Sequence, residues 1–281
     1  MAQNLQLLKR RIKTAKNVSQ IAKAMEMMSA SKIKRAQKTV ENNKPYVKKI
    51  EEITSQLITH TDMKKFTHPY ITGNNSEKKL LIAISPDKGL CGSLNTNLFK
   101  KLLSLEVKDT KIVTIGKKVE KFAAKTTSEF VASFPMGNTI PRFTNVFEIV
   151  KLIEMYYNTG EVGTVEVLFT EFHSFFSQVP VVKKLLPIDT SVFSQEAQSF
   201  HLFEPNTQSL LETLLPQYIE TAIYSALLEA YTSEQVARMI AMQNAKTNAN
   251  DIASYLSLVY NKSRQEKITG EILDLTNSQQ N

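Results

Sequence analysis

The C-terminal quarter of the chain holds the feature that most constrains the fold. Neither glycine nor proline occurs between Pro216 and Gly270, a stretch of about 53 residues. Its apolar residues recur at steps of three and four, which is the spacing of one face of a helix. A helix of this length would measure roughly 80 Å, so its apolar stripe needs a partner that is equally long.

The N-terminal stretch from Met1 to Lys44 can supply that partner. It also lacks glycine and proline, and its apolar residues keep the same helical period. Many of these residues in both stretches are alanines, and small residues let two helix backbones approach closely. We therefore expect the N- and C-terminal helices to pair in a long coiled coil.

Prolines and a capping signal predict where these helices break, bend and begin. Pro45 predicts an interruption of the first helix, which resumes to about residue 60. Residues 209–212 match a capping box, so the last helix is expected to begin there and to bend near Pro216. If both prolines mark the same end of an antiparallel pair, facing residue numbers sum to about 261. Met25 then lies near Arg238.

The middle of the chain has a different character. Apolar runs typical of strands begin near residues 79, 111, 130, 162 and 179, and helical patterns lie between the first four. Alternating strands and helices predict a largely parallel sheet with helices outside it, and the last two strands are candidates for a hairpin. The expected domains are an N-terminal coiled-coil helix at 1–60, a Rossmann-like α/β domain inserted at 76–200, and a C-terminal coiled-coil helix at 209–281.

The net charge of +8 is concentrated at the N-terminus. Residues 1–40 carry ten basic side chains and one acidic one, so the rest of the chain is near neutral. A basic helix face can be a solvated surface, a nucleic-acid contact or a surface for an acidic protein. Composition alone does not choose among the three.

Several classes of function have little support in the sequence. Cys91 is the single cysteine, and the four histidines lack metal-ligand spacing, so no metal site is expected. No apolar run is long enough for a transmembrane helix, and no signal peptide or transit peptide is expected. Residues 87–93 follow a strand and precede a helix, but they match neither dinucleotide-binding nor Walker A spacing. The carboxylates are scattered, so we expect no catalytic residues and no cofactor.

Specific segments at both ends and in the middle carry a family resemblance. They are IAKAMEMMSASKIKRAQ at 21–37, SEQVARMIAMQ at 233–243, LVYNKSRQEKITGE at 258–271 and DKGLCGSLNTNLFKKLL at 87–103. With HPY at 68–70 and SQVP at 177–180, they resemble the gamma subunit of rotary F-type ATP synthases, in order, from about residue 2 to 275.

The resemblance implies a fold and a role. The terminal helices would form an antiparallel coiled coil that turns as a shaft inside the ring of alpha and beta subunits. The α/β insert would be a foot that binds epsilon and sits on the membrane c-ring, with delta in the same complex. The chain would couple ion flow to ATP synthesis or hydrolysis without catalysing it. It would lie peripherally on the cytoplasmic face of the inner membrane and bind no nucleic acid.

The same resemblance implies which residues contact partners. Coupling positions match Met25, Arg238, Arg264, Gln265, Thr269 and Glu271. An acidic loop of beta would meet Lys9, Arg10, Arg11, Lys13, Lys23, Lys32 and Arg35. Lys88, Gly89 and Cys91 would form a loop contact of the foot. Ser278 and Gln279 depart from the glycine and alanine of the family signature, which leaves the contacts of the extreme tip open.

Two other readings stay open at this point. A basic coiled-coil nucleic-acid binder would explain the charge, and would show nucleic-acid affinity that falls steeply with salt. A nucleotide-dependent enzyme built on the α/β domain would bind nucleotide tightly as an isolated chain.

Overall fold

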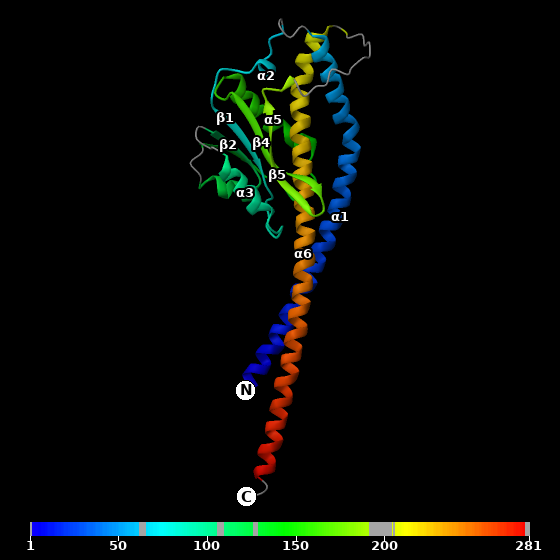
Figure 1. Cartoon of the computed structure of the whole chain (residues 1–281), viewed down its shortest axis with the longest axis vertical. Coiled ribbons are helices and arrows are strands. Elements are labelled where there is room, and N and C mark those ends of the chain that lie inside the picture. The colour runs from blue at the N-terminus through cyan, green and yellow to red at the C-terminus, as the bar shows by residue number, and fades with distance from the viewer. Residues whose placement is uncertain are drawn as a thin grey trace. The chain divides into compact units, whose positions relative to one another are not determined.

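A computed structural model describes residues 2–61, 66–105, 110–125, 129–190, 204 and 206–278, with side chains of the two long helices described from Leu5 to Leu273. Two long helices lie at the two ends of the sequence, namely α1 (Ala2–His60) and α6 (Thr207–Ser278). Between them lie α2 (Pro69–Thr72), β1 (Lys79–Ile84), α3 (Leu94–Ser104), β2 (Thr110–Ile115), α4 (Lys117–Ala123), β3 (Glu129–Phe134), a short 3-10 turn (Phe143–Asn145), α5 (Val146–Asn158), β4 (Thr164–Ser174) and β5 (Ser177–Leu186) (Figure 1). Among the described residues, no helix is long and apolar enough to span a membrane.

The first helix runs through its proline, so the interruption predicted at Pro45 is wrong. Proline removes the hydrogen bond to the carbonyl of Glu41, four residues earlier. Both residues are exposed, so water can satisfy the carbonyl that loses its donor. Helix α6 likewise continues through Pro216, where the expected bend stays a prediction.

The last helix begins earlier than its capping box suggested. Thr207 is its first residue, and the Ser209 amide donates to the Asn206 side-chain oxygen at 2.8 Å. Asn206 is therefore the N-cap, and Ser209 occupies the third helical position. The expected start at 209 is wrong by two residues because asparagine caps a helix as well as serine does.

The predicted sheet is confirmed, with strand order β3-β2-β1-β4-β5. β1 pairs in parallel with β2 and β4, and β2 pairs in parallel with β3. β4 and β5 form the antiparallel hairpin that the sequence suggested. Figure 1 shows helices on both faces of the sheet. The central strands β1 and β2 are covered on both sides, which explains their largely apolar sequence.

Successive residues of β1 point to two different cores. Leu80, Ile82 and Ile84 belong to the larger one, which includes α5 and parts of α1 and α6. Leu81 and Ala83 belong to the smaller one, which α3 and α4 complete. This alternation is the two-residue period of a strand. The parallel pairing of β1, β2 and β3 places their carboxyl ends at one edge of the sheet.

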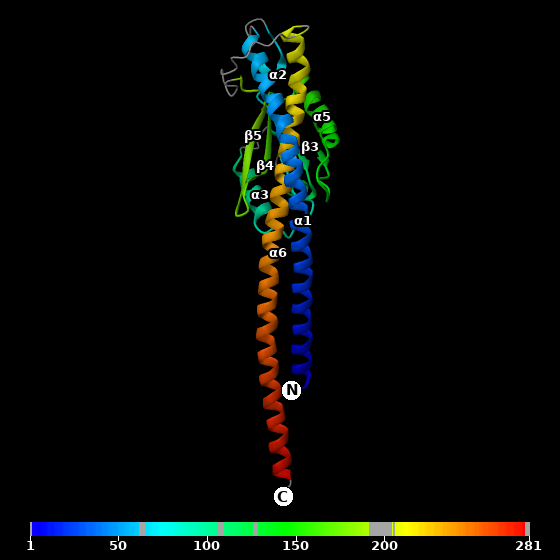
Figure 2. The same ribbon diagram turned by 90° about the vertical axis from the view of Figure 1, so that its right-hand side faces the viewer.

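Two compact units divide the chain. The helical unit comprises residues 1–30 and 238–281, and the mixed unit comprises residues 31–237. In the helical unit, α1 and α6 pack together, as predicted. Figure 2 shows the C-terminal end of α6 extending beyond the N-terminal end of α1. Most of the buried residues described in this unit are small, namely Ser19, Ala22, Ser29, Ala249 and Ala253, and the larger ones are Leu8, Arg238 and Met242.

A contact across this seam bears on the predicted register. The Lys246 amine lies 2.6 Å from the Glu26 carboxylate, and these residue numbers sum to 272 (26 + 246). A register of about 261 would place the two residues roughly 16 Å apart along the axis. Helical side chains lean toward the N-terminus of their own helix, so these two lean toward each other and cover part of that distance. The contact therefore favours a sum above 261, and the pairing of Met25 with Arg238 stays a prediction.

His68 caps α2 through its ring. Its Nδ1 accepts from the Tyr70 amide at 3.2 Å, and the ring stacks with Phe66 and meets Tyr70 edge-on. Burial lowers the pKa of His68 below its ordinary 6.5, although the Glu212 carboxylate partly opposes this shift. Protonation of Nδ1 would remove the lone pair that accepts this bond.

We expect the stability of the protein to fall as acid protonates His68. Because its pKa is lowered in the folded state, its contribution is complete above pH 6.5 and is lost as pH falls through the folded pKa. The His68→Asn variant keeps a capping side chain that does not titrate, so its melting temperature should depend less on pH between 7 and 5. Parallel pH profiles of the two proteins would contradict this role.

Candidate functional site

The basic residues of α1 present most of their charge to solvent. Five of those predicted to meet an acidic loop lie in the helical unit and are exposed, namely Lys9, Arg10, Arg11, Lys13 and Lys23. The other two, Lys32 and Arg35, lie in the mixed unit. Arg35 is exposed, whereas the Lys32 amine donates to the Asn138 carbonyl at 2.8 Å. The Lys32 amine is therefore already hydrogen-bonded to a loop of its own chain.

The predicted coupling residues divide into two environments. Met25 is half-buried and Arg238 is buried, so both sit within packed parts of the helices. The others lie near the end of α6 and are exposed, namely Arg264, Gln265, Thr269 and Glu271. In this segment the Thr269 hydroxyl donates to the Gln265 carbonyl at 3.0 Å, and Lys267 pairs with Glu271 at 3.3 Å. Both interactions are local, so they leave the guanidinium of Arg264 and the amide of Gln265 facing outward.

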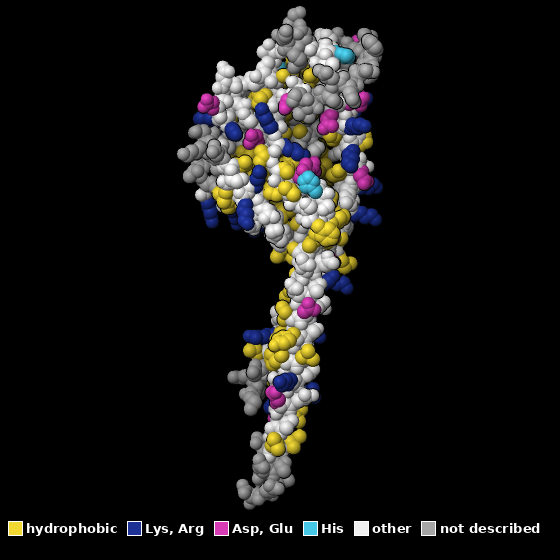
Figure 3. Space-filling model, in the orientation of Figure 1, with side chains coloured by type: hydrophobic (Ala, Val, Ile, Leu, Met, Phe, Trp, Pro, Cys, Tyr) yellow, Lys and Arg dark blue, Asp and Glu magenta, His cyan; other side chains and the backbone are white. Residues whose placement is uncertain are grey.

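Apolar side chains also reach the surface of the helical unit. Tyr255 is 67% exposed and Leu258 is 70% exposed. The other large apolar residues that are exposed in the described part of this unit are Leu7, Val18, Ile21, Met27, Met28, Ile252, Ile268, Ile272 and Leu273. Figure 3 shows hydrophobic and basic side chains together on one face of these helices. Such a surface is typical of helices that are enclosed by other proteins. A helix that faces water keeps its apolar residues on one buried stripe.

The loop after β1 is held by Asp87. Its carboxylate accepts from the amides of Lys117 at 2.9 Å, Gly137 at 2.8 Å and Met136 at 3.4 Å. The Ser85 hydroxyl accepts from the Val119 amide at 2.9 Å. Asp87 and Ser85 therefore satisfy amides at the start of α4, and Asp87 ties the turn at residues 87–93, which precedes α3, to the rest of the domain. The arrangement supports a structural turn rather than a nucleotide site.

The predicted loop contact of the foot has one buried member. Cys91 is buried, and its sulfur accepts a hydrogen bond from the side-chain Nδ2 of Asn95 at 3.3 Å. Lys88 is exposed, and Gly89 is half-buried near the Lys118 amine. Leu90, which the sequence did not single out, is exposed with φ of 63°. The exposed residues of this loop are therefore Lys88, Leu90, Gly92 and Ser93, and Cys91 supports it from inside.

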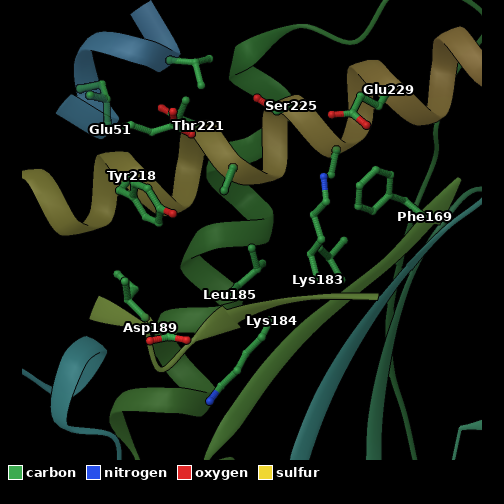
Figure 4. A pocket seen from close by; sticks show the side chains of 16 residues that line it. Glu51, Phe169, Lys183, Lys184, Leu185, Asp189, Tyr218, Thr221, Ser225 and Glu229 are labelled. Atoms are coloured by element: carbon green, nitrogen blue, oxygen red, sulfur yellow. The ribbon is translucent and has the colours of Figure 1, made fainter. Parts of the chain in front are cut away.

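A cavity of about 500 Å³ lies between the sheet and the long helices within the mixed unit. Figure 4 shows Glu51 of α1, Lys183 of β5, and Tyr218 and Glu229 of α6 around it. Burial raises the pKa of the Glu229 carboxyl, and the Lys183 amine opposes that shift. Burial also raises the pKa of Tyr218. The lining of this cavity contains no histidine or cysteine.

Metal-binding groups are also lacking in the described part of the chain. No group of three or more histidine, cysteine, aspartate or glutamate side chains could hold a metal ion there.

Comparison with known proteins shows which family the chain resembles. A family model described as ATP synthase matches residues 4–280. The ATP synthase gamma chain of Dehalococcoides mccartyi is 35% identical over 275 residues, which cover 97% of this chain and 96% of that one. The gamma chain of Heliobacterium modesticaldum is 36% identical over 280 residues and 95% of each chain.

Solved structures share the fold. A chain of the Euglena gracilis mitochondrial ATP synthase, in an OSCP/F1/c-ring structure, has a TM-score of 0.70 and 18% identity, over 99% of this chain and 94% of that one. A central stalk and c-ring structure from Tetrahymena thermophila contains a chain with a TM-score of 0.60 and 24% identity, over 80% of this chain and 99% of that one.

Proposed function

Because this chain belongs to the family of ATP synthase gamma chains, we propose that its helical unit turns against the alpha and beta subunits while its α/β domain binds epsilon and the c-ring. The chain is a non-catalytic subunit and forms the central rotor stalk. The delta subunit would belong to the same complex. The complex would be attached peripherally to the cytoplasmic face of the bacterial inner membrane.

The observation that carries this proposal is the surface of the helical unit. Its apolar residues are exposed on both helices, with basic residues of α1 among them. Apolar contacts favour enclosure by other subunits, and exposed ion pairs are worth only about 0–1 kcal/mol each. Weak contacts of this kind let one helix surface meet successive beta subunits during rotation. Each contact biases the conformation of the beta subunit it touches, because that subunit binds it better in one state than in another.

In this proposal the α/β domain supplies the attachment to the ring. Asp87 fixes the loop whose exposed residues include Lys88 and Leu90, so the loop can offer a rigid contact to a partner. Ion flow would turn the c-ring and the attached domain together, and α6 would carry that rotation into the catalytic head.

We expect neutralisation of the basic face to weaken coupling. Replacing Lys9, Arg10, Arg11 and Lys13 with glutamine removes four exposed charges, and at a few tenths of a kcal/mol each the affinity for the alpha–beta ring should fall about tenfold. Assembly and ATP-driven proton pumping in reconstituted vesicles would measure the effect. The matched control is Lys100, Lys101, Lys121 and Lys125 changed to glutamine, which removes four exposed cations from the mixed unit.

Equal behaviour of the two quadruple variants would contradict a role for the basic face. The nucleic-acid alternative is tested with the same proteins. If the unmodified chain binds DNA with an affinity that falls steeply with salt, and the N-terminal quadruple variant loses it, the basic face is a nucleic-acid surface instead.

A further inference from the structure

In the helical unit, the pattern of buried residues between α1 and α6 repeats after seven residues. Ala22 and Ser29 are buried on α1, and Met242 and Ala249 are buried on α6, each pair seven residues apart. If one helix slipped by seven residues, a shift of about 10 Å, buried positions would again face buried positions. Small side chains fit many holes of the facing helix about equally well. Packing alone therefore discriminates weakly between the native register and the slipped one.

One ion pair does not repeat in this way. The Lys246 amine meets the Glu26 carboxylate at 2.6 Å, and the side chains are 28% and 22% exposed, respectively. Seven residues along α6 on either side of Lys246 stand Met239 and Ala253, neither of which can pair with Glu26. A slipped register would therefore leave a largely buried carboxylate beside apolar groups, and a largely buried amine without its acid. Both are unfavourable, because a charge removed from water needs a partner.

We propose that Glu26 and Lys246 are positioning residues that fix the axial register of α6 against α1. The pair adds little to packing but penalises every seven-residue slip, as single polar residues in coiled-coil seams do. The inference rests on the central-stalk function, in which α6 must carry rotation without sliding along its partner. It also gives Lys246 a role within the chain. Glu26 directly follows the predicted coupling residue Met25 in the sequence.

The register can be measured on the full-length chain alone. Spin labels would be attached to cysteines at two exposed positions, Gln20 and Asn261, in a Cys91→Ser background. A slip of seven residues changes the axial separation of these positions by about 10 Å and therefore changes the measured distance by a large part of that amount. We expect one distance in the parent and a second, shifted by about that amount, in the Glu26→Gln/Lys246→Met double variant.

Charge reversal separates pairing from packing. Glu26→Lys/Lys246→Glu restores opposite charges, so it should return the single parental distance. The Glu52→Gln variant breaks the exposed Lys49–Glu52 pair of α1, and it should leave the distance unchanged. If a single substitution fails to fold, the double and reversed variants still decide. A single parental distance in the double variant would overturn the proposal.

The functional counterpart uses the assembled complex in vesicles. Loss of the register should lower the number of protons pumped per ATP hydrolysed by twofold or more while hydrolysis itself continues, and charge reversal should restore that ratio. An unchanged ratio in a double variant that does show two distances would also overturn the proposal. Because the spin-label distance requires no partner, failure of the subunit contacts proposed above would leave this result intact and distinguishable.

Discussion

Replacing Gly116 with alanine is expected to destabilise the α/β domain by more than about 4 kcal/mol. Gly116 connects β2 to α4 with φ of 101°, a region that side chains rarely adopt. An added Cβ would lie 1.9 Å from the Ser85 carbonyl oxygen, which is backbone and cannot rotate away. The strain of φ costs about 1–2 kcal/mol, and the clash should bring the total above about 4 kcal/mol. That is a large share of the ordinary 5–15 kcal/mol of domain stability.

Gly160 provides the matched control for this substitution. Its φ is 76°, but nothing lies within 4 Å of an added Cβ. Gly160→Ala should therefore show the backbone strain alone, about 1 kcal/mol in denaturant unfolding followed by circular dichroism. Similar losses in the two variants would show that the approach of Ser85 to Gly116 does not constrain the fold.

Asp87→Ala is expected to destabilise the same edge of the sheet by about 3 kcal/mol. It removes a carboxylate that accepts from the amides of Lys117, Met136 and Gly137, and hydrogen bonds to charged groups contribute about 1.5–3 kcal/mol each. Asp87 is half-buried, so water replaces part of the loss. The control is Glu77→Ala, which removes an exposed carboxylate next to Lys78 in the sequence. It should change the unfolding free energy by less than about 0.5 kcal/mol.

Hydrogen exchange would locate the effect of Asp87. The amides of Lys117 and Gly137 should lose protection first in Asp87→Ala, while α5 keeps its protection. Loss that is uniform over the sheet, or no loss at all, would contradict the anchoring role of this carboxylate.

Long-range patterns in the sequence predicted the architecture well. The period of apolar residues in α1 and α6, and the continuous apolar runs of β1 and β2, directly reflect which faces are covered. The failures were local. Pro45 carries a strong helix-breaking signal, yet the packing of a long helix outweighs one missing hydrogen bond. The start of α6 was misplaced because both Asn206 and Ser209 are good capping residues.

The predicted site residues were harder to place, for physical reasons. Sequence resemblance selected Cys91 together with Lys88, but burial of the cysteine depends on the turn that Asp87 holds. Lys32 appeared as one more cation of a basic helix, and only the fold brings the Asn138 carbonyl to its amine. Glu26 and Lys246 are far apart in sequence, so their contact could have been found only from a known register.

Direct observation of rotation tests the central-stalk account most directly. A probe would be attached to a cysteine at exposed Lys101 of the α/β domain, in a Cys91→Ser chain assembled with its alpha and beta subunits on a surface. The account predicts that ATP drives the probe round in one direction, in three steps per turn set by the three beta sites. ATP hydrolysis by the assembled complex with a stationary or randomly moving probe would contradict it.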